Sequence, residues 1–387
     1  MLPRSRRASR LAIPLGFAAA LAAAAAPAAA QPVAVPLSSD AWIATDSIRF
    51  EPYLGRPSLY INRGVALARG VSLENGTIEF DMAATRSTNF LGVAFRAASP
   101  TFANVVFVRV GSSGTAEAVQ YGPAFNSVGV AWQVYHGDGA NAVAILDRGR
   151  WMHFRIELVG AVARVFVDTA TTPTLVVPRL VESGGSGLGV WAGAFGRGAY
   201  FSNIRFTTAP ATAAARRPDL PPGTLARWAI SDVVDAADFT PAALPDLARR
   251  RWTRVEPEPE GFVLINRWRP APAADLPRDS SGDILADSVM SGRFAGAKVV
   301  YARTTVVAER AGIRRMQYGY NNGVVIYANG RPLVMGMNPG GLRRGSGVMA
   351  LAGDAVYLPL KRGRNEIVFA VLDVTGGWAF WARLDPA

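Results

Sequence analysis

The strongest constraint on the fold is a two-residue alternation of apolar and polar side chains that recurs along most of the chain. Successive side chains of a strand point to opposite faces, so this period is typical of strands with one buried face. Segments 76–82 and 104–110 show it clearly. Segments 153–159 and 162–167 flank Gly160-Ala161 as the two arms of a hairpin would. The sequence therefore predicts an all-β protein.

The first 30 residues predict an export signal. Four arginines precede an uncharged, alanine-rich run that ends in three alanines before Gln31. A basic stretch, an apolar stretch and a small-residue cleavage site are the parts of a secretory signal peptide. An uncleaved membrane anchor and a twin-arginine signal around Ser5-Arg6-Arg7 remain alternatives. We expect a periplasmic or secreted protein with no membrane span after signal cleavage.

A break in the alternation divides the rest of the chain. Segment 208–222 has no period and contains four prolines, which favours a Pro/Ala-rich linker. Alternation covers 38–207 before this segment and 223–387 after it. The sequence thus predicts two antiparallel β-sandwich domains of the jelly-roll type.

Composition excludes several classes of function. The chain has no cysteine, which removes thiol nucleophiles, thiolate metal sites and disulfides. A Ser-His-Asp triad or a multi-histidine zinc site would have to be built from its two histidines, His136 and His153. The chain also lacks a nucleophile elbow, a phosphate loop and a dinucleotide fingerprint. We therefore predict no catalytic set, no metal and no cofactor. The formal net charge is +12, but four of the arginines lie in the predicted signal and the other basic runs are short. This favours dispersed charge or affinity for an acidic envelope polymer, with no nucleic acid as partner.

The first predicted domain carries an ordered set of short motifs, among them Gly76-Thr77-Ile78-Glu79-Phe80-Asp81 and Gly187-Leu188-Gly189-Val190-Trp191. In this order the set resembles the concanavalin A-like lectin and glucanase superfamily in its laminin-G-like form. The resemblance implies two curved antiparallel sheets, with glycans bound on the concave face in the members that bind them. The other motifs are 92–96, 120–123, 132–133, 151–155, 163–168 and 199–204.

A ligand surface in this domain is predicted from planar hydrogen-bonding groups near aromatic rings. Arginine and glutamine offer fixed donors and acceptors, and aromatic rings stack on the apolar face of a sugar. Outward solvated charge and, for Trp132, core packing remain alternatives. The candidate residues are Arg96, Arg109, Gln120, Tyr121, Trp132, Gln133, Tyr135 and His136.

The second predicted domain resembles the galactose-binding-like β-sandwich, through segments 301–304, 319–330, 354–367 and 376–380. Where related domains often have Ser-Asp after Gly-Tyr, this chain has two asparagines. Turn chemistry and buried aromatic rings are the alternative explanation of these residues. The candidate ligand residues are Tyr320, Asn321, Asn322 and Trp378, with Arg343 and Arg344 as further loop groups.

We expect a non-catalytic carbohydrate-binding protein. One alternative is a glycoside hydrolase-like enzyme with its site on the concave face of the first domain, because Glu79 and Asp81 are spaced to share a strand face. The third carboxylate of such enzymes is missing at 82–84, and the sequence favours two solvated polar residues on the outer face of a strand over a catalytic pair. His136 lies in a glycine-rich turn, and His153 is expected to be structural. The other alternative is a structural or protein-binding envelope protein.

Overall fold

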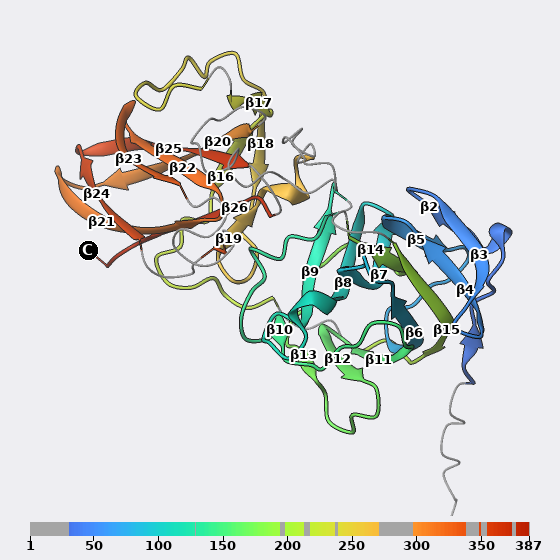
Figure 1. Ribbon diagram of the computed structural model, residues 1–387. Helices are drawn as coiled ribbons and strands as arrows, with labels where there is room; N and C mark the ends of the chain where they lie inside the picture. The colour runs from blue at the N-terminus through green and yellow to red at the C-terminus, as the bar shows by residue number, and fades with distance from the viewer. Residues whose placement is uncertain are drawn as a thin grey trace, which may run out of the picture. The chain divides into compact units, whose positions relative to one another are not determined.

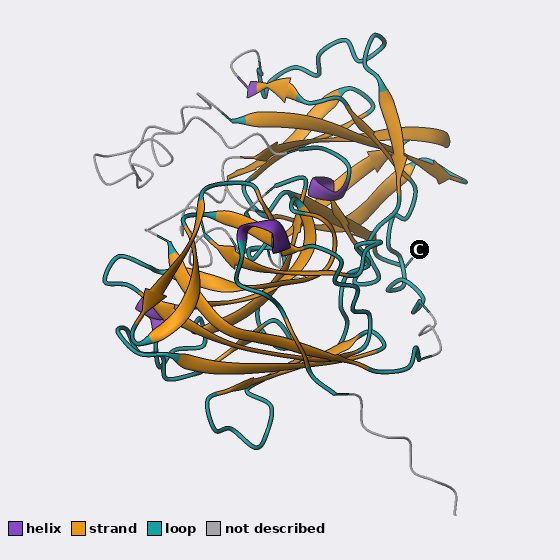
Figure 2. Cartoon of the chain, turned by 90° about the vertical axis from the view of Figure 1, so that its right-hand side faces the viewer, coloured by secondary structure: helices purple, strands orange, loops and turns teal. Residues whose placement is uncertain are grey.

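The computed structural model describes residues 31–127, 129–193, 198–212, 217–236, 239–270, 297–337, 348–349, 354–373 and 377–386. The predicted signal peptide lies outside these ranges, and the chain from Pro32 onward forms one compact unit. Figure 2 shows that strands dominate and that helical segments are short. No helix in the described ranges has the length and apolarity needed to cross a membrane. The 3-10 turns in these ranges are η1 (Ser39–Ala41), η2 (Val110–Ser112) and η4 (Ile265–Arg267).

The first sheet has the strand order β13-β12-β11-β6-β15-β4-β3, with β1 added on β15 (Figure 1). Every pairing in it is antiparallel, and β11 and β12 form the hairpin predicted around Gly160-Ala161. Its strands are β1 (Val33–Ala34), β3 (Ile48–Tyr53), β4 (Arg56–Ile61), β6 (Gly76–Ala84), β11 (Met152–Val159), β12 (Val162–Val167), β13 (Leu175–Val177) and β15 (Ala199–Thr208).

The second sheet has the order β10-β9-β8-β7-β14-β5-β2 and is also antiparallel. Its strands are β2 (Trp42–Ala44), β5 (Gly64–Ala68), β7 (Phe90–Ser99), β8 (Phe102–Arg109), β9 (Val119–Phe125), β10 (Asn141–Ala142) and β14 (Gly187–Ala192).

These two sheets pack face to face around an apolar core. Ile78 and Phe80 of β6 join Val93 and Phe95 of β7 in one buried cluster. Residues between them in sequence point to the other face of each sheet, as Glu79 does. The alternation of apolar and polar residues in the sequence therefore corresponds to two sheets packed as a sandwich.

The third and fourth sheets use strands from the second half of the chain. The third has the order β18-β16-β20-β25-β22-β23 with β17 on β20, and the fourth the order β19-β26-β21-β24. The third contains β16 (Trp228–Ser231), β17 (Val234–Asp235), β18 (Trp252–Val255), β20 (Lys298–Ala308), β22 (Gly323–Ala328), β23 (Arg331–Met337) and β25 (Gly363–Asp373). The fourth contains β19 (Phe262–Leu264), β21 (Gly312–Tyr320), β24 (Asp354–Leu360) and β26 (Ala379–Leu384).

The third and fourth sheets enclose a second core. Ile326 and Phe369 of the third sheet pack with Leu358 and Phe380 of the fourth. Every named strand pairing among the described residues links strands on the same side of segment 208–222. The predicted all-β class with antiparallel sandwiches is thus confirmed. The domain limits and the linker remain predictions.

The compact unit also contains contacts across that segment. Phe262 and Trp381 belong to the same buried cluster as the core of the first sandwich. The side-chain amide of Asn126 donates to the backbone carbonyl of Asn266 at 2.8 Å. The Arg267 guanidinium lies 4.7 Å from the centroid of the Phe125 ring. We call this set of contacts the junction.

Gly92 provides a test of the packing in the second sheet. A methyl group at this position would lie 2.2 Å from the Val106 carbonyl oxygen and 2.6 Å from Phe107 Cα. We expect Gly92→Ala to lower the free energy of unfolding by about 1–3 kcal/mol, measured by urea denaturation. Gly312→Ala is the matched control, because nothing lies within 4 Å of the added methyl, and it should change stability by no more than about 0.5 kcal/mol. Equal effects of the two substitutions would contradict this packing.

Candidate functional site

One row of residues crosses the second sheet on the face turned away from the sandwich core. The register pairs Asn141 with Gln120, Gln120 with Phe107, and Phe107 with Gly92, which pairs with Trp191. Directly paired residues share a face, so the row is polar on β10 and β9 and aromatic on β8 and β14. Gly92 leaves room for the Phe107 and Trp191 rings, whose centroids are 5.2 Å apart. The polar end of this row forms the candidate site.

Glu117 is the centre of that polar end. It lies in the turn before β9, and its carboxylate accepts from His136 Nε2 at 2.6 Å and Arg109 Nη1 at 2.7 Å. Gln120 also donates to it through Nε2, and Asn141 donates at 3.4 Å. The side chains of Glu117, His136 and Arg109 are 30%, 28% and 18% exposed, so this network is reached from solvent. We define the Glu117 cluster as Arg109, Glu117, Gln120, Trp132, His136 and Asn141.

The surroundings of Glu117 keep its carboxyl group ionised. The hydrogen bond from His136 is the main cause that lowers the pKa of Glu117, and the charges of His136 and Arg109 act in the same direction. An ionised carboxylate is a strong acceptor for hydroxyl donors. It is a poor proton donor, so Glu117 does not meet the requirement for a general acid at neutral pH.

Arg109 is held between two aromatic rings. Its guanidinium carbon lies 4.8 Å from the centroid of the Trp132 ring and 5.2 Å from that of Phe90. Phe90 is the direct cross-strand partner of Arg109, so the register itself brings ring and cation together. Trp132 is half-buried and also packs against the buried cluster that contains Phe107 and Trp191, as the core-packing alternative expected. Its ring is the aromatic member of the Glu117 cluster.

Gln120 presents a buried acceptor with no partner. The residue is 1% exposed, and no donor among the described residues lies within hydrogen-bond distance of Oε1. The orientation of the amide is fixed by chemistry, because the ionised Glu117 carboxylate can only accept and so must face the amide nitrogen. A buried carbonyl without a donor costs free energy in the folded state.

His136 lies where the sequence predicted, in a turn rich in glycine. Gly137 and Gly139 adopt φ angles of 90° and 79°, a region that glycine occupies without strain. The turn is closed by hydrogen bonds from the backbone N–H groups of Ala140 and Asn141 to the Gly137 carbonyl. This turn brings His136 back to Glu117.

Two predicted ligand residues of the first sandwich lie elsewhere. Arg96 sits at an irregularity of β7 and donates to the backbone carbonyls of Glu74 and Gly160. Tyr121 is 1% exposed; its hydroxyl donates to Asn104 at 2.7 Å and accepts from the Val181 N–H at 2.8 Å. Both side chains are occupied in holding the sandwich together, so the prediction that they share a ligand surface is corrected.

Two more predicted ligand residues belong to the junction. The side-chain oxygen of Gln133 accepts from the Gly377 N–H at 2.8 Å, and its backbone carbonyl accepts from Met349 at the same distance. The Tyr135 ring packs edge-on against Phe262 with centroids 5.5 Å apart. Burial raises the pKa of Tyr135 well above its ordinary value. The sequence predicts these two residues in the ligand surface. It does not predict the junction, to which their side chains belong.

The predicted ligand residues of the second sandwich are buried. Asn321 accepts from the Ala379 N–H at 2.9 Å, and Trp378 donates through its indole N–H to the Val371 carbonyl at 3.2 Å. Tyr320 is 5% exposed and stacks with Tyr318. These are structural positions, as the alternative explanation held. Arg343 and Arg344 lie outside the described residues.

The fourth of these residues, Asn322, holds a buried carboxyl group. Its side-chain amide donates to Asp373 at 3.0 Å, and Asp373 is 5% exposed. Burial raises the pKa of Asp373 from the ordinary 3.8 to about 8, and the Asn322 hydrogen bond only partly opposes this. Between pH 3.8 and about 8, Asp373 is therefore protonated in the folded protein and ionised in the unfolded chain.

This proton makes stability fall as pH rises. The stability contributed by Asp373 is complete below pH 3.8 and is lost as pH rises through its folded pKa of about 8, with a slope of about 1.4 kcal/mol per pH unit. We expect Asp373→Asn to be less sensitive to pH than the unchanged protein in urea unfolding at pH 5, 7 and 9. Exposed Asp138→Asn serves as control. Parallel pH profiles for the unchanged protein and the Asp373 variant would contradict this result.

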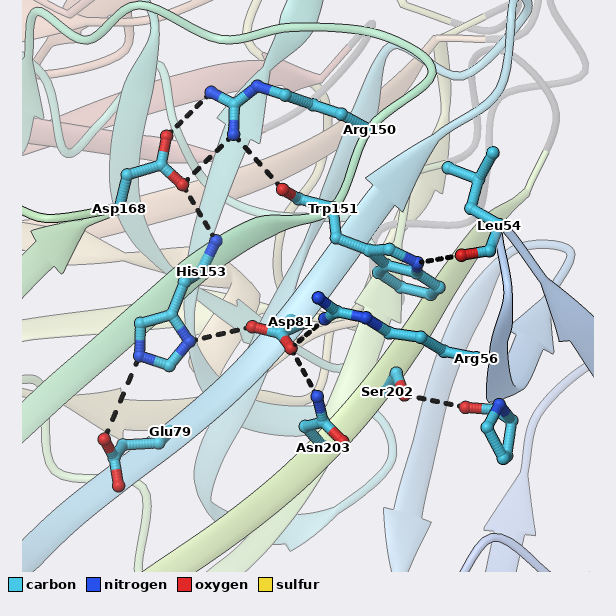
Figure 3. A network of polar contacts seen from close by, with 11 residues as sticks. Leu54, Arg56, Glu79, Asp81, Arg150, Trp151, His153, Asp168, Ser202 and Asn203 are labelled. Carbon is cyan, nitrogen blue, oxygen red and sulfur yellow. Dashed lines mark hydrogen bonds and ion pairs between the residues drawn. The ribbon is translucent and has the colours of Figure 1, made fainter.

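Glu79 and Asp81 do share the outer face of the first sheet, as their spacing predicted. Figure 3 shows His153 between them, with Nδ1 2.8 Å from Asp81 and Nε2 3.9 Å from Glu79. Asp81 also accepts from Arg56 at 2.5 Å and from Asn203 at 2.6 Å. His153 therefore has the structural role expected for it, as a link between neighbouring strands.

This network does not supply the acid of a glycosidase. Arg205 donates to Glu79 at 2.8 Å, and this hydrogen bond lowers the pKa of the Glu79 carboxyl group. A retaining or inverting glycosidase needs one carboxyl group that stays protonated, which requires a raised pKa. Both carboxylates of the pair are held by arginines instead.

Comparisons with known proteins give a fold likeness only. No known protein family matches the sequence, and no curated protein matches it. The carbohydrate-binding module CBM66 from Bacillus subtilis is 16% identical, with 43% of this chain and 96% of the module covered and a TM-score of 0.34. A protein of unknown function with a galectin-like fold from Bacillus subtilis is 11% identical over 46% of this chain and 96% of its own, with a TM-score of 0.34. Similarity at this level carries no argument about what this chain binds.

Proposed function

We propose that the protein is an exported, non-catalytic carbohydrate-binding protein of the periplasm or cell exterior, and that the Glu117 cluster is its glycan site. The observation that carries this proposal is the solvent-accessible pair of Glu117 and Arg109 beside the half-buried Trp132 ring. A sugar hydroxyl can donate to this carboxylate or accept from this guanidinium, while the ring packs against the apolar face of the sugar.

The groups around Gln120 suit a sugar. Glu117 accepts from hydroxyl groups, and Arg109 donates from a guanidinium held between two rings. Trp132 offers an aromatic edge and face beside these polar groups. Adjacent hydroxyls on one sugar ring can bond to Glu117 and Arg109 together, since these two side chains contact each other at 2.7 Å. The site therefore favours a neutral sugar with neighbouring free hydroxyls.

Binding without hydrolysis follows from the charge state of the cluster. The hydrogen-bond and ion-pair partners of Glu117 are Arg109, Gln120, His136 and Asn141, none of which is a second carboxylate. With a lowered pKa and no acidic partner, Glu117 binds hydroxyl groups but does not protonate a leaving group.

The proposal predicts specific losses of affinity. The purified protein is first screened on a glycan array, and the best ligand is titrated by calorimetry. We expect Trp132→Ala and Glu117→Gln each to weaken binding about 10-fold or more, since each removes a contact worth about 1.4 kcal/mol or more. Thermal unfolding should confirm that both variants fold.

Matched controls lie on exposed positions of the second sandwich. Tyr357→Ala removes a ring that is 65% exposed, and Glu309→Gln removes one exposed negative charge. Neither should change the affinity. If the array shows no ligand, or if Tyr357→Ala weakens binding as much as Trp132→Ala does, the Glu117 cluster is not the glycan site.

A further inference from the structure

A groove runs beside the third sheet, with a cavity volume of about 1210 Å³. It is formed by described segments that include Arg179–Glu182, Ala226–Ala229 and Arg254–Glu260. Seven arginines and five glutamates line it, so positive charges are in excess. The groove contains no residue of the Glu117 cluster.

Part of the charge that lines the groove is held in ion pairs. Glu258 accepts two hydrogen bonds from the Arg267 guanidinium, at 2.7 and 3.1 Å. Glu256 lies 3.5 Å from Arg217. Paired charges of this kind leave little net field for a ligand.

Where the third sheet lines the groove, arginines outnumber glutamates. The register places Arg254 of β18 and Arg303 of β20 on either side of Ala229 of β16, so all three share one face. Arg227 precedes β16, and Arg364 lies on β25 opposite Val307. Two lining glutamates lie close to these arginines in sequence, Glu256 two residues after Arg254 and Glu366 two residues after Arg364. We call Arg227, Arg254, Arg303, Arg364 and Trp268 the arginine groove.

The arginines of this wall are not used in ion pairs. Within the described ranges, no carboxylate lies within ion-pair distance of Arg227, Arg254 or Arg303. Arg303 is nevertheless ordered, because its guanidinium stacks 3.8 Å from the centroid of the Trp252 ring. Stacking uses the face of the guanidinium and leaves its N–H edge available, which matches the geometry of a carboxylate.

The distance between the arginines favours a polymer with repeated negative charges as the ligand. Arg254 and Arg303 are separated by one intervening strand, so their backbones are about 9–10 Å apart. Two arginines this far apart engage different units of a chain more readily than one small anion. Trp268, which is 38% exposed, adds an aromatic surface on which a sugar ring can stack.

We propose that the arginine groove binds the uronic-acid units of an acidic polysaccharide. A polymer with one carboxylate on each sugar and hydroxyl groups between them meets both the arginines and the exposed tryptophan. Single-stranded nucleic acid stacks successive bases on several rings, whereas Trp268 is the one exposed ring among the described residues that line the groove. The site is separate from the Glu117 cluster, so either can exist without the other.

The test compares a hexamer of galacturonic acid with a hexamer of galactose by calorimetry on the full protein. We expect the acidic hexamer to bind, and Arg254→Gln combined with Arg303→Gln to weaken it about 10-fold or more. Raising the salt from 50 to 300 mM should weaken binding in the unchanged protein more than in this variant. Since Arg303 packs on Trp252, Arg227→Gln combined with Arg254→Gln is a second variant that spares that contact.

Controls separate this site from general charge and from the Glu117 cluster. Arg69→Gln combined with Arg86→Gln makes the same charge change on exposed positions of the first sandwich and should leave the affinity unchanged. Trp132→Ala should weaken only the neutral glycan. The proposal is overturned if the acidic hexamer does not bind, if the Arg69 and Arg86 changes weaken it equally, or if single-stranded DNA binds the arginine groove as tightly as the uronate.

Discussion

The structure depends on burying one face of each sheet against the sheet that lies opposite it. There is no cysteine for a disulfide, and the helical segments among the described residues are single 3-10 turns. Burial of apolar side chains between sheets therefore supplies the main stabilising interaction. The two sandwich cores do this on the inner faces, and smaller clusters around Phe107 and around Tyr301 cover parts of the outer faces. The clusters of polar side chains lie at the edges of these apolar clusters.

The candidate sites follow from this arrangement. On the second sheet, the covered outer face around Phe107 and Trp191 gives way to Gln120 and Asn141 on the strands at its edge. On the third sheet, the apolar cluster around Tyr301 adjoins a stretch where Arg254 and Arg303 face a groove. In both places an aromatic cluster ends beside arginine side chains, which is the combination that sugars and their acidic derivatives require.

Period and turn chemistry were sufficient to predict the class of fold, the hairpin at Gly160-Ala161 and the turn that carries His136. The requirement for planar polar groups near aromatic rings selected Arg109, Gln120, Trp132 and His136, which the structure brings together. It also selected Arg96, Tyr121, Gln133 and Tyr135, which hold the sandwich or the junction together. Gln120 and Tyr121 are neighbours in one strand and must point to opposite faces, so only one of them could belong to the site. Glu117 was missed because it precedes the strand in a loop, where alternation carries no signal. The role of Gln133 depends on Gly377, far along the chain, and local sequence does not encode such a contact.

The central claim is that a glycan binds at the Glu117 cluster, where the amide of Gln120 donates to Glu117. The chain has four glutamines, so selective 15N labelling of glutamine side chains gives a spectrum with four pairs of amide signals, assigned by substitution. Titration with the glycan found on the array should shift the Gln120 pair in a saturable way and leave the pair of Gln133, buried in the junction, in place. A saturable shift of Gln133 or Gln317 with an unmoved Gln120 pair would show that the glycan binds elsewhere.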